Sequence, residues 1–467
     1  MAMGKRKTER QQELWIAAAD LPEAPGHPFY RKLNGLLDES GFDPFVEGLC
    51  QKFYHDELGR PSVPPGVYFR MLLIGYFEGI DSERGIAWRC DDSRTLRDFL
   101  GYDPKEVTPD HSSLSRIRQR MDVETHGEVF TWVLKRLAEK GLLKGRTLGI
   151  DATTLEANAA MRSIVRRDTG EGYNEFLTQL AQASGIATPT REDLAQIDKK
   201  RKNKASNDDW TNPNDPDAKV AQMKDGRTHL AHKAEHAVDL DSGAIVAVTV
   251  QGADQGDTTT LWNTMEESVE NLREVTDDPQ TAECIEGKII AEVVADKGYH
   301  SNDTCRDMKE AHVRTYFAEP DRGGRVWVDD EGNPKSAEQA AVYANRRRIR
   351  GRRGKVLLRK RGELLERPFA HCYETGGMRR THLRGHRNIL KRLLIHVAGF
   401  NLALAMRSLF GIGKPRCLQD GLGAAILGVF DSIWGLLERM GGLGARLRRF
   451  EPLPAAREPQ TSLCAAA

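Results

Sequence analysis

Apolar residues in the first third of the chain recur at the three- and four-residue spacing that is typical of helices. Between residues 29 and 121, a strongly apolar stretch follows the pair Pro64-Pro65, which favours a helix start. Three polar residues precede later helical segments and are predicted N-caps: Ser82, Asp92 and Ser112. A further helix is predicted over residues 127–140. Residues 28–143 are therefore predicted to form an all-helical domain.

At residue 146 the pattern changes to a short β-branched run, RTLGIDATTL, which predicts a strand over residues 146–155. Residues 232–238 and 244–250 alternate around the turn sequence Asp-Ser-Gly, which predicts a hairpin. The remaining predicted elements are helix 258–275, strand 289–295, helix 303–311, strand 313–317 and helix 363–373. Three strands that begin a mixed sheet, with helices later, are the order of an RNase H-like fold. We predict an α+β chain in which residues 144–410 form an RNase H-like domain with flanking helices.

Three segments lack such patterns. Residues 160–225 are polar and rich in Asp, Asn, Lys and Pro, with one helical piece near residues 173–184, so we predict an insertion after the first strand. Residues 1–27 carry no sustained periodicity and are expected to be a mobile tail. Residues 411–467 alternate Gly-rich and Arg-rich pieces and predict no clear fold.

Composition excludes a wholly disordered or membrane-embedded protein. The chain has 467 residues, 39% of them hydrophobic, and 69 Lys plus Arg against 68 Asp plus Glu. The apolar stretch at residues 423–437 is interrupted by Asp431, whereas a spanning helix needs about 20 apolar residues, so no membrane anchor is expected. Seven scattered cysteines without a Cys-x-x-Cys pair are typical of a reducing compartment. We expect a cytoplasmic protein.

The near-zero net charge hides two basic segments. Residues 346–361, here called the basic run, contain ten Lys and Arg and no acidic residue, which favours a polyanion partner over an ordinary solvated face. The run is interleaved with Gly351 and Gly354, and for this reason we do not expect it to be a base-reading helix. A second candidate is a helix near residues 112–121 that carries Arg116, Arg118 and Arg120. Such a helix is either a DNA-reading segment or an ordinary surface helix.

Two aspartates stand where a buried strand has no structural need of a charge. Asp151 lies in the middle of the first predicted strand, and Asp296 ends a second apolar strand just before a turn through Gly298. Strand ends at one edge of a mixed sheet commonly hold ligands, and carboxylate oxygens suit Mg²⁺ or Mn²⁺. The competing interpretation, stronger for Asp296, is that the side chain only caps a turn. Glu366, on the helix predicted after the basic run, is the candidate third carboxylate.

Two other groups of metal-ligand residue types are weaker candidates. His229, His232 and His236 would gather on one face of a helix, but in the predicted strand only two of them share a face. The set Cys372, His382 and His386 lacks the second cysteine that a zinc finger requires. We expect no zinc site in either group.

Three segments in order carry a family resemblance: GIDATTLEANA, VVADKGYHSND and RGELLERPFAH. With the helical domain before them and HRNILKRLLIHVAGFNLALAMR after them, they resemble the DDE transposases of bacterial insertion sequences. The resemblance covers about residues 28–407. It implies that Asp151, Asp296 and Glu366 form an acidic catalytic triad that holds two Mg²⁺ or Mn²⁺ ions.

The resemblance further implies cleavage of double-stranded DNA at transposon ends and strand transfer into target DNA, by a homodimer in the DNA complex. The arginines expected to contact DNA are Arg116, Arg118, Arg120, Arg346, Arg347, Arg350, Arg352, Arg353, Arg367 and Arg379. We expect the basic run to bind phosphates and the helix with Arg116 to read bases. Two alternatives stay open: an RNase H-like nuclease without strand transfer, and an inactive DNA-binding transposase remnant.

One departure affects the third carboxylate. Many relatives carry Tyr-x2-Arg-x3-Glu-x6-Lys; here Tyr343 and Arg346 match its start, but Arg350 stands at the position of the Glu. Glu363 and Glu374 are therefore rivals to Glu366. We prefer Glu366 because the Arg-Pro-Phe that follows it matches a branch of the family without the full signature.

Overall fold

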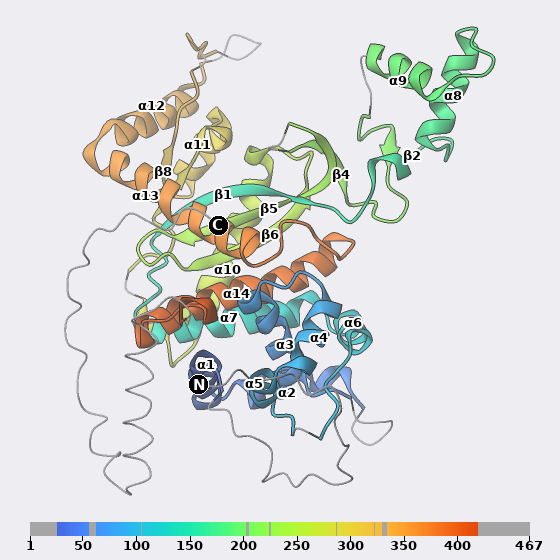
Figure 1. The fold of residues 1–467 in the computed structure, drawn as a ribbon. Helices are drawn as coiled ribbons and strands as arrows, with labels where there is room; N and C mark the ends of the chain where they lie inside the picture. The colour runs from blue at the N-terminus through green and yellow to red at the C-terminus, as the bar shows by residue number, and fades with distance from the viewer. Residues whose placement is uncertain are drawn as a thin grey trace, which may run out of the picture. The chain divides into compact units, whose positions relative to one another are not determined.

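The computed structural model describes residues 26–418, except 56–61, 104, 202–204, 224–225, 286, 322 and 329–333. The predicted tail at residues 1–27 and the undefined segment 411–467 therefore fall almost entirely outside the described residues. The chain up to Pro415 forms one compact unit. It is a mixed α+β structure with an N-terminal helical region and a mixed sheet (Figure 1).

Seven α-helices and one 3₁₀ turn make up the described part of the N-terminal region. They are α1 (Pro28–Glu39), α2 (Phe42–Cys50), η2 (Gln51–Phe53), α3 (Pro65–Glu78), α4 (Glu83–Asp92), α5 (Arg94–Leu100), α6 (His111–Arg120) and α7 (Val123–Glu139). Ser82 caps α4 as predicted, since its side chain accepts from the Gly85 amide. The other two predicted caps are wrong by one or two residues: Ser93 caps α5, and Asp110 caps α6.

The sheet has the strand order β4-β5-β1-β7-β8, with β6 paired to β5. Its strands are β1 (Thr147–Glu156), β4 (Lys219–Gln222), β5 (Thr228–Asp239), β6 (Ile245–Gly252), β7 (Glu292–Ala295) and β8 (Arg314–Phe317). The first strand and the β5–β6 hairpin match the sequence prediction. β1 runs antiparallel to β5 and parallel to β7, and β7 runs parallel to β8. β1 is thus a central strand with a partner on each side.

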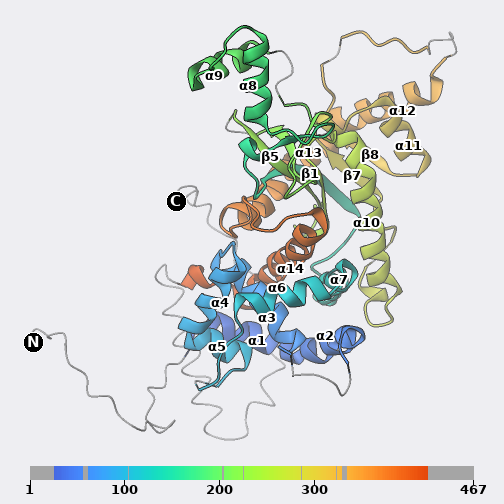
Figure 2. The ribbon, with the colours of Figure 1, turned by 90° about the vertical axis from the view of Figure 1, so that its right-hand side faces the viewer.

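Helices cover the sheet from both faces (Figures 1 and 2). They are α10 (Asp257–Asp277), α11 (Asn302–Glu310), α12 (Ser336–Arg350), α13 (Arg352–Phe369), a π-helical turn η6 (Ala370–Glu374) and α14 (His386–Phe410); short 3₁₀ turns η4 (Ala282–Cys284), η5 (Lys297–Tyr299) and η7 (Pro415–Leu418) lie between or after them. α13 packs on the face of β1 that carries Gly149, because a Cβ at this glycine would lie 2.5 Å from Leu365 Cδ1. The basic run, in which no helix was predicted before residue 363, is helical: it lies in α12 and α13 with a break at Gly351. Its expected role as a phosphate-binding segment, not a base-reading helix, stays a prediction.

Helix α14 joins the helical region to the sheet. It packs against α3, α7 and β6, so the two predicted domains share one core. By length and composition α14 could cross a membrane, but most of its apolar window is buried inside the protein. Its buried Asn401 accepts from the Ile245 amide at 2.9 Å and donates to the Ile245 carbonyl at 2.8 Å. A side chain that hydrogen-bonds the end of a strand in this way marks α14 as a core helix.

The predicted insertion stands beyond the end of β1 (Figure 1). It contains η3 (Met161–Ser163), β2 (Val165–Arg166), α8 (Tyr173–Ala183), α9 (Arg191–Lys200) and β3 (Trp210–Thr211). α8 matches the helical piece predicted from the sequence, whereas α9 was not predicted. A small core around Trp210 and Ile164 holds the insertion together.

Candidate active site

Asp151 lies at the centre of β1, on the face covered by α13. Its Oδ1 accepts a hydrogen bond from the Ala152 amide at 2.9 Å, and its Oδ2 accepts from Arg361 Nη1 at 3.0 Å. Burial raises the pKa of the Asp151 carboxyl above its ordinary value; the Arg361 guanidinium opposes this shift, and the charge of Asp296 adds to it. A charged side chain is thus held in a strand interior by one cation and one amide.

Asp296 directly follows β7 and begins the 3₁₀ turn η5. Its Oδ1 accepts from the Gly298 amide at 2.8 Å. The parallel register pairs Gly149 with Val294, and two residues further along both strands come Asp151 and Asp296. The strand register and the effect of the Asp296 charge on the pKa of Asp151 both indicate that the two predicted aspartates lie close together.

Gly298 is required by space rather than by an unusual backbone angle. A Cβ at this position would lie 2.3 Å from Asp257 Oδ2 and 3.1 Å from Asp296 Oδ1. The carboxylate of Asp257, the first residue of α10, is therefore also beside the turn that carries Asp296. Sequence reasoning missed Asp257.

Glu366 is exposed on α13 and is not gathered with the two aspartates. Arg361 points to Asp151, and a residue five positions later on a helix is turned by about 140° from it. Among the described residues, no group of three or more His, Cys, Asp or Glu side chains is arranged to hold a metal ion. The assignment of Glu366 as the third carboxylate stays a prediction.

The two rival glutamates have arginine partners. Glu363 pairs with Arg367 at 2.7 Å on the surface of α13. Glu374 accepts from Arg379 Nε at 2.9 Å, and Nη1 of the same arginine donates to Thr153 Oγ1 at 3.0 Å. Arg379 thus connects the π-helical turn to β1, two residues from Asp151.

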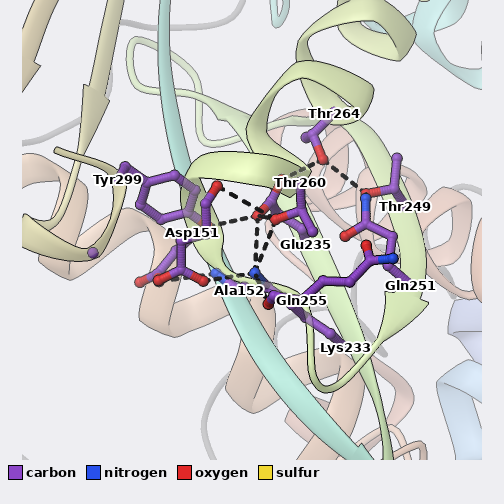
Figure 3. Close-up of polar contacts among 12 residues, drawn as sticks. Asp151, Ala152, Lys233, Glu235, Thr249, Gln251, Gln255, Thr260, Thr264 and Tyr299 are labelled. Carbon is purple, nitrogen blue, oxygen red and sulfur yellow. Dashed lines mark hydrogen bonds and ion pairs between the residues drawn. The ribbon is translucent and has the colours of Figure 1, made fainter. Parts of the chain in front are cut away.

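A buried polar network fills the space behind Asp151 on the α10 face of the sheet. Figure 3 shows Lys233, Thr260, Thr264 and Tyr299 converging on Glu235, which is fully buried. The Tyr299 hydroxyl donates to Glu235 Oε1 at 2.7 Å, and Thr260 Oγ1 donates to the same oxygen at 2.8 Å. Burial raises the pKa of Glu235, and the hydroxyl donors oppose that shift.

Lys233 connects the network around Glu235 to Asp257, the carboxylate beside the turn that carries Asp296. Its Nζ donates to Asp257 Oδ1 at 2.6 Å and to Thr260 Oγ1 at 2.8 Å. Lys233 and Glu235 alternate along β5, so both point to α10. Two charged residues at alternate positions of an apolar strand are the signal from which this network could have been predicted.

The arginines of α6 separate into exposed and buried residues. Arg116 and Arg120 are exposed, and Arg120 lies over the Tyr54 ring at 5.0 Å. Arg118 is only 8% exposed, and its Nε donates to Glu83 Oε1 at 2.8 Å. Since Arg118 joins α6 to α4, its assignment to a base-reading surface does not fit the geometry.

Ion pairs hold two arginines of the basic run. Arg346 pairs with Glu319, and Arg353, whose side chain is 59% exposed, pairs with the buried Glu292. Both arginines therefore connect α12 and α13 to the sheet region. Outside these two pairs, the exposed arginines of the run are Arg347, Arg350, Arg352 and Arg359, here called the exposed run arginines.

The histidines of β5 have different neighbours. His232 lies 3.2 Å from Asp215, and His236 hydrogen-bonds the Tyr373 hydroxyl, both in buried surroundings. His229 lies 4.0 Å from Glu156 and is partly exposed. Each ring has a partner in the protein.

Comparison with protein families gives two matches. A transposase domain (DUF772) matches residues 18–120, and a transposase DDE domain matches residues 195–402. The chain belongs to the DDE transposases of insertion sequences, a family that binds DNA. The DDE match includes Asp296 and Glu366, whereas Asp151 lies between the two matched segments. Searches of curated proteins and of solved structures found no match.

Proposed function

We propose that this protein is a metal-dependent transposase with an RNase H-like core that cleaves DNA at transposon ends and joins the freed ends to target DNA. The observation that carries the proposal is the placement of Asp151, within β1, and Asp296, directly after β7, each two residues beyond the last pair of these parallel strands, close enough for the Asp296 charge to raise the pKa of Asp151. Water attacks the phosphorus atom and the bond to the 3′ oxygen breaks, so that this oxygen leaves and is protonated to a 3′-hydroxyl. The 3′-hydroxyl then attacks a phosphodiester of the target; a new P–O bond forms, the target's own bond between phosphorus and its 3′ oxygen breaks, and a target 3′-hydroxyl is released.

The donor set of the site fits Mg²⁺ or Mn²⁺. Both aspartates offer carboxylate oxygens, the ligands that these cations prefer. Asp151, Asp296 and Glu366 would hold two ions, which when bound stabilise charge on the attacking and leaving oxygens. Lys233 pairs with Asp257, whose carboxylate lies beside Gly298 in the turn that carries Asp296.

The exposed arginines supply the proposed DNA surface. The exposed run arginines and Arg367 would contact phosphates beside the site, whereas Arg116 and Arg120 on α6 would approach base edges. Because two transposon ends must be joined, we propose a homodimer in the DNA complex. We place the reaction in the cytoplasm, consistent with the free thiols of Cys50, Cys90, Cys284, Cys305 and Cys372.

Conservative substitution of the three carboxylates tests the proposal. Asp151→Asn, Asp296→Asn and Glu366→Gln should each abolish Mg²⁺- or Mn²⁺-dependent cleavage of end-containing DNA and leave DNA binding within about twofold, since each keeps shape and removes one ligand charge. Glu363→Gln and Glu374→Gln are the matched controls and should stay active.

The outcomes separate the alternatives. Cleavage that persists in EDTA would exclude the metal mechanism. If Glu366→Gln is active and the Gln variant of Glu363 or of Glu374 is inactive, the third ligand is the glutamate whose variant is inactive. Cleavage without joined products in a gel assay with target plasmid would favour the nuclease.

A further inference from the structure

Both oxygens of the Asp151 carboxylate are already engaged. Oδ1 accepts from the Ala152 amide, and Oδ2 accepts from Arg361 at 3.0 Å. The Arg361 side chain is 17% exposed and that of Asp151 is 27% exposed, so solvent reaches this contact only in part. A cation that binds Asp151 must therefore displace the guanidinium or share its oxygen with it.

The same helix carries the proposed third carboxylate on another side. Residues 361 and 366 are about 140° apart around the axis of α13. In the structure, Arg361 faces Asp151, whereas Glu366 faces solvent. Arg361, and not Glu366, is therefore the residue of α13 that lies against Asp151 in the structure.

We propose that Arg361 is a positioning residue that makes cation binding at Asp151 depend on DNA. In the DNA-free protein Arg361 occupies Oδ2 of the Asp151 carboxylate; a DNA backbone phosphate takes over the guanidinium and leaves this oxygen open to a cation. This inference rests on the proposed function. It adds the coupling between substrate and metal, for which the family assignment gives no residue.

A phosphate is well suited to displace this contact. Guanidinium groups bind phosphate oxygens through two parallel hydrogen bonds, whereas Arg361 makes a single hydrogen bond to Asp151. Ion pairs with solvent access are weak, so a stronger bidentate partner replaces them readily.

Mn²⁺ binding to the full-length protein, followed by electron paramagnetic resonance, tests the inference without activity. In the absence of DNA, Arg361→Gln should bind Mn²⁺ at least tenfold more tightly than the wild type, and Arg361→Met should do the same. The gain should vanish in the double variant with Asp151→Asn. Adding a 20-bp duplex of arbitrary sequence should tighten Mn²⁺ binding to the wild type but change Arg361→Gln little.

Lys135→Gln is the matched control, because it removes a similarly exposed ion pair, with Asp278 at 2.9 Å, away from the site. It should bind Mn²⁺ as the wild type does. The role of Arg361 is overturned if Arg361→Gln, Arg361→Met and the wild type bind Mn²⁺ with equal affinity in the absence of DNA. In that case the loss of cleavage in Asp151→Asn would still support the proposed function. Full cleavage by Asp151→Asn would instead overturn the proposed function, and this inference with it.

Discussion

Removing the Tyr299 hydroxyl, which belongs to the network behind the site, should lower both the stability of the protein and its cleavage activity. In Tyr299→Phe, Glu235 loses the donor at 2.7 Å and keeps those from Thr260 and Thr264. Tyr299 is 1% exposed and Glu235 is fully buried, so water does not replace the lost hydrogen bond. A buried hydrogen bond to a charged group contributes about 1.5–3 kcal/mol, and this is the expected loss in free energy of unfolding.

The variant should also reduce cleavage, because Tyr299 ends the turn that begins at Asp296. A matched control exists in Tyr316→Phe, which removes a donor to the buried Glu292 at 3.2 Å on β7 and β8. Both variants should lose stability in urea unfolding. Only Tyr299→Phe should also need more Mn²⁺ for half-maximal cleavage of end-containing DNA at a temperature where both are folded.

Two results would refute this reasoning. A stability loss below about 0.5 kcal/mol for Tyr299→Phe would mean that Glu235 does not depend on this donor as a buried carboxylate should. An equal Mn²⁺ requirement in the two variants would mean that the network does not position Asp296.

Two further predictions concern pH and salt. Burial lowers the pKa of His126 to about 4, so the folded protein keeps its full stability above pH 6.5 and loses about 3 kcal/mol of it as the pH falls from 6.5 to 4, where the unfolded chain binds a proton and the folded protein does not. Urea unfolding of His126→Gln should therefore show a flatter pH dependence than that of the wild type. Replacing the exposed run arginines by Ala should reduce the slope of log K against log salt by about 0.9 per lost phosphate contact, on all duplexes alike. Replacing Arg116 and Arg120 should instead reduce the preference for end DNA over scrambled DNA. If a salt titration shows the reverse pattern, the two roles are exchanged.

Five of the six strands of the main sheet were predicted from the sequence because they obey local rules, whereas β4 was missed, since it lies in the segment predicted to be an insertion. β1 and the β5–β6 hairpin are β-branched or alternating runs bounded by turn residues, and burial on both sides keeps that pattern clear. Asp151 was found for the same reason, since a charge is conspicuous in such a strand. Asp257 was missed because an aspartate at the first turn of a helix is ordinary until its neighbours are known.

The basic run shows where local rules were incomplete. Its density of arginine and glycine argued against a base-reading helix, and no helix was predicted before residue 363, whereas Gly354 is buried within α13 where α12 approaches. A Cβ there would lie 2.2 Å from the Arg348 carbonyl oxygen. This glycine allows two backbones to pack closely, and its function depends on a contact that sequence spacing does not reveal.

The three proposed carboxylates differ in how firmly the fold holds them. Asp151 lies within β1, and Asp296 directly follows β7, two residues beyond the last paired residues of the two strands, Gly149 and Val294. Glu366 lies on a helix that contacts the sheet through side chains such as Leu365 and Arg361. Two of the carboxylates are thus placed by paired strands and the third by side-chain packing. Because Arg352 and Arg367, two of the arginines that we propose to bind DNA, lie on the same helix as Glu366, we expect DNA binding to affect the position of Glu366.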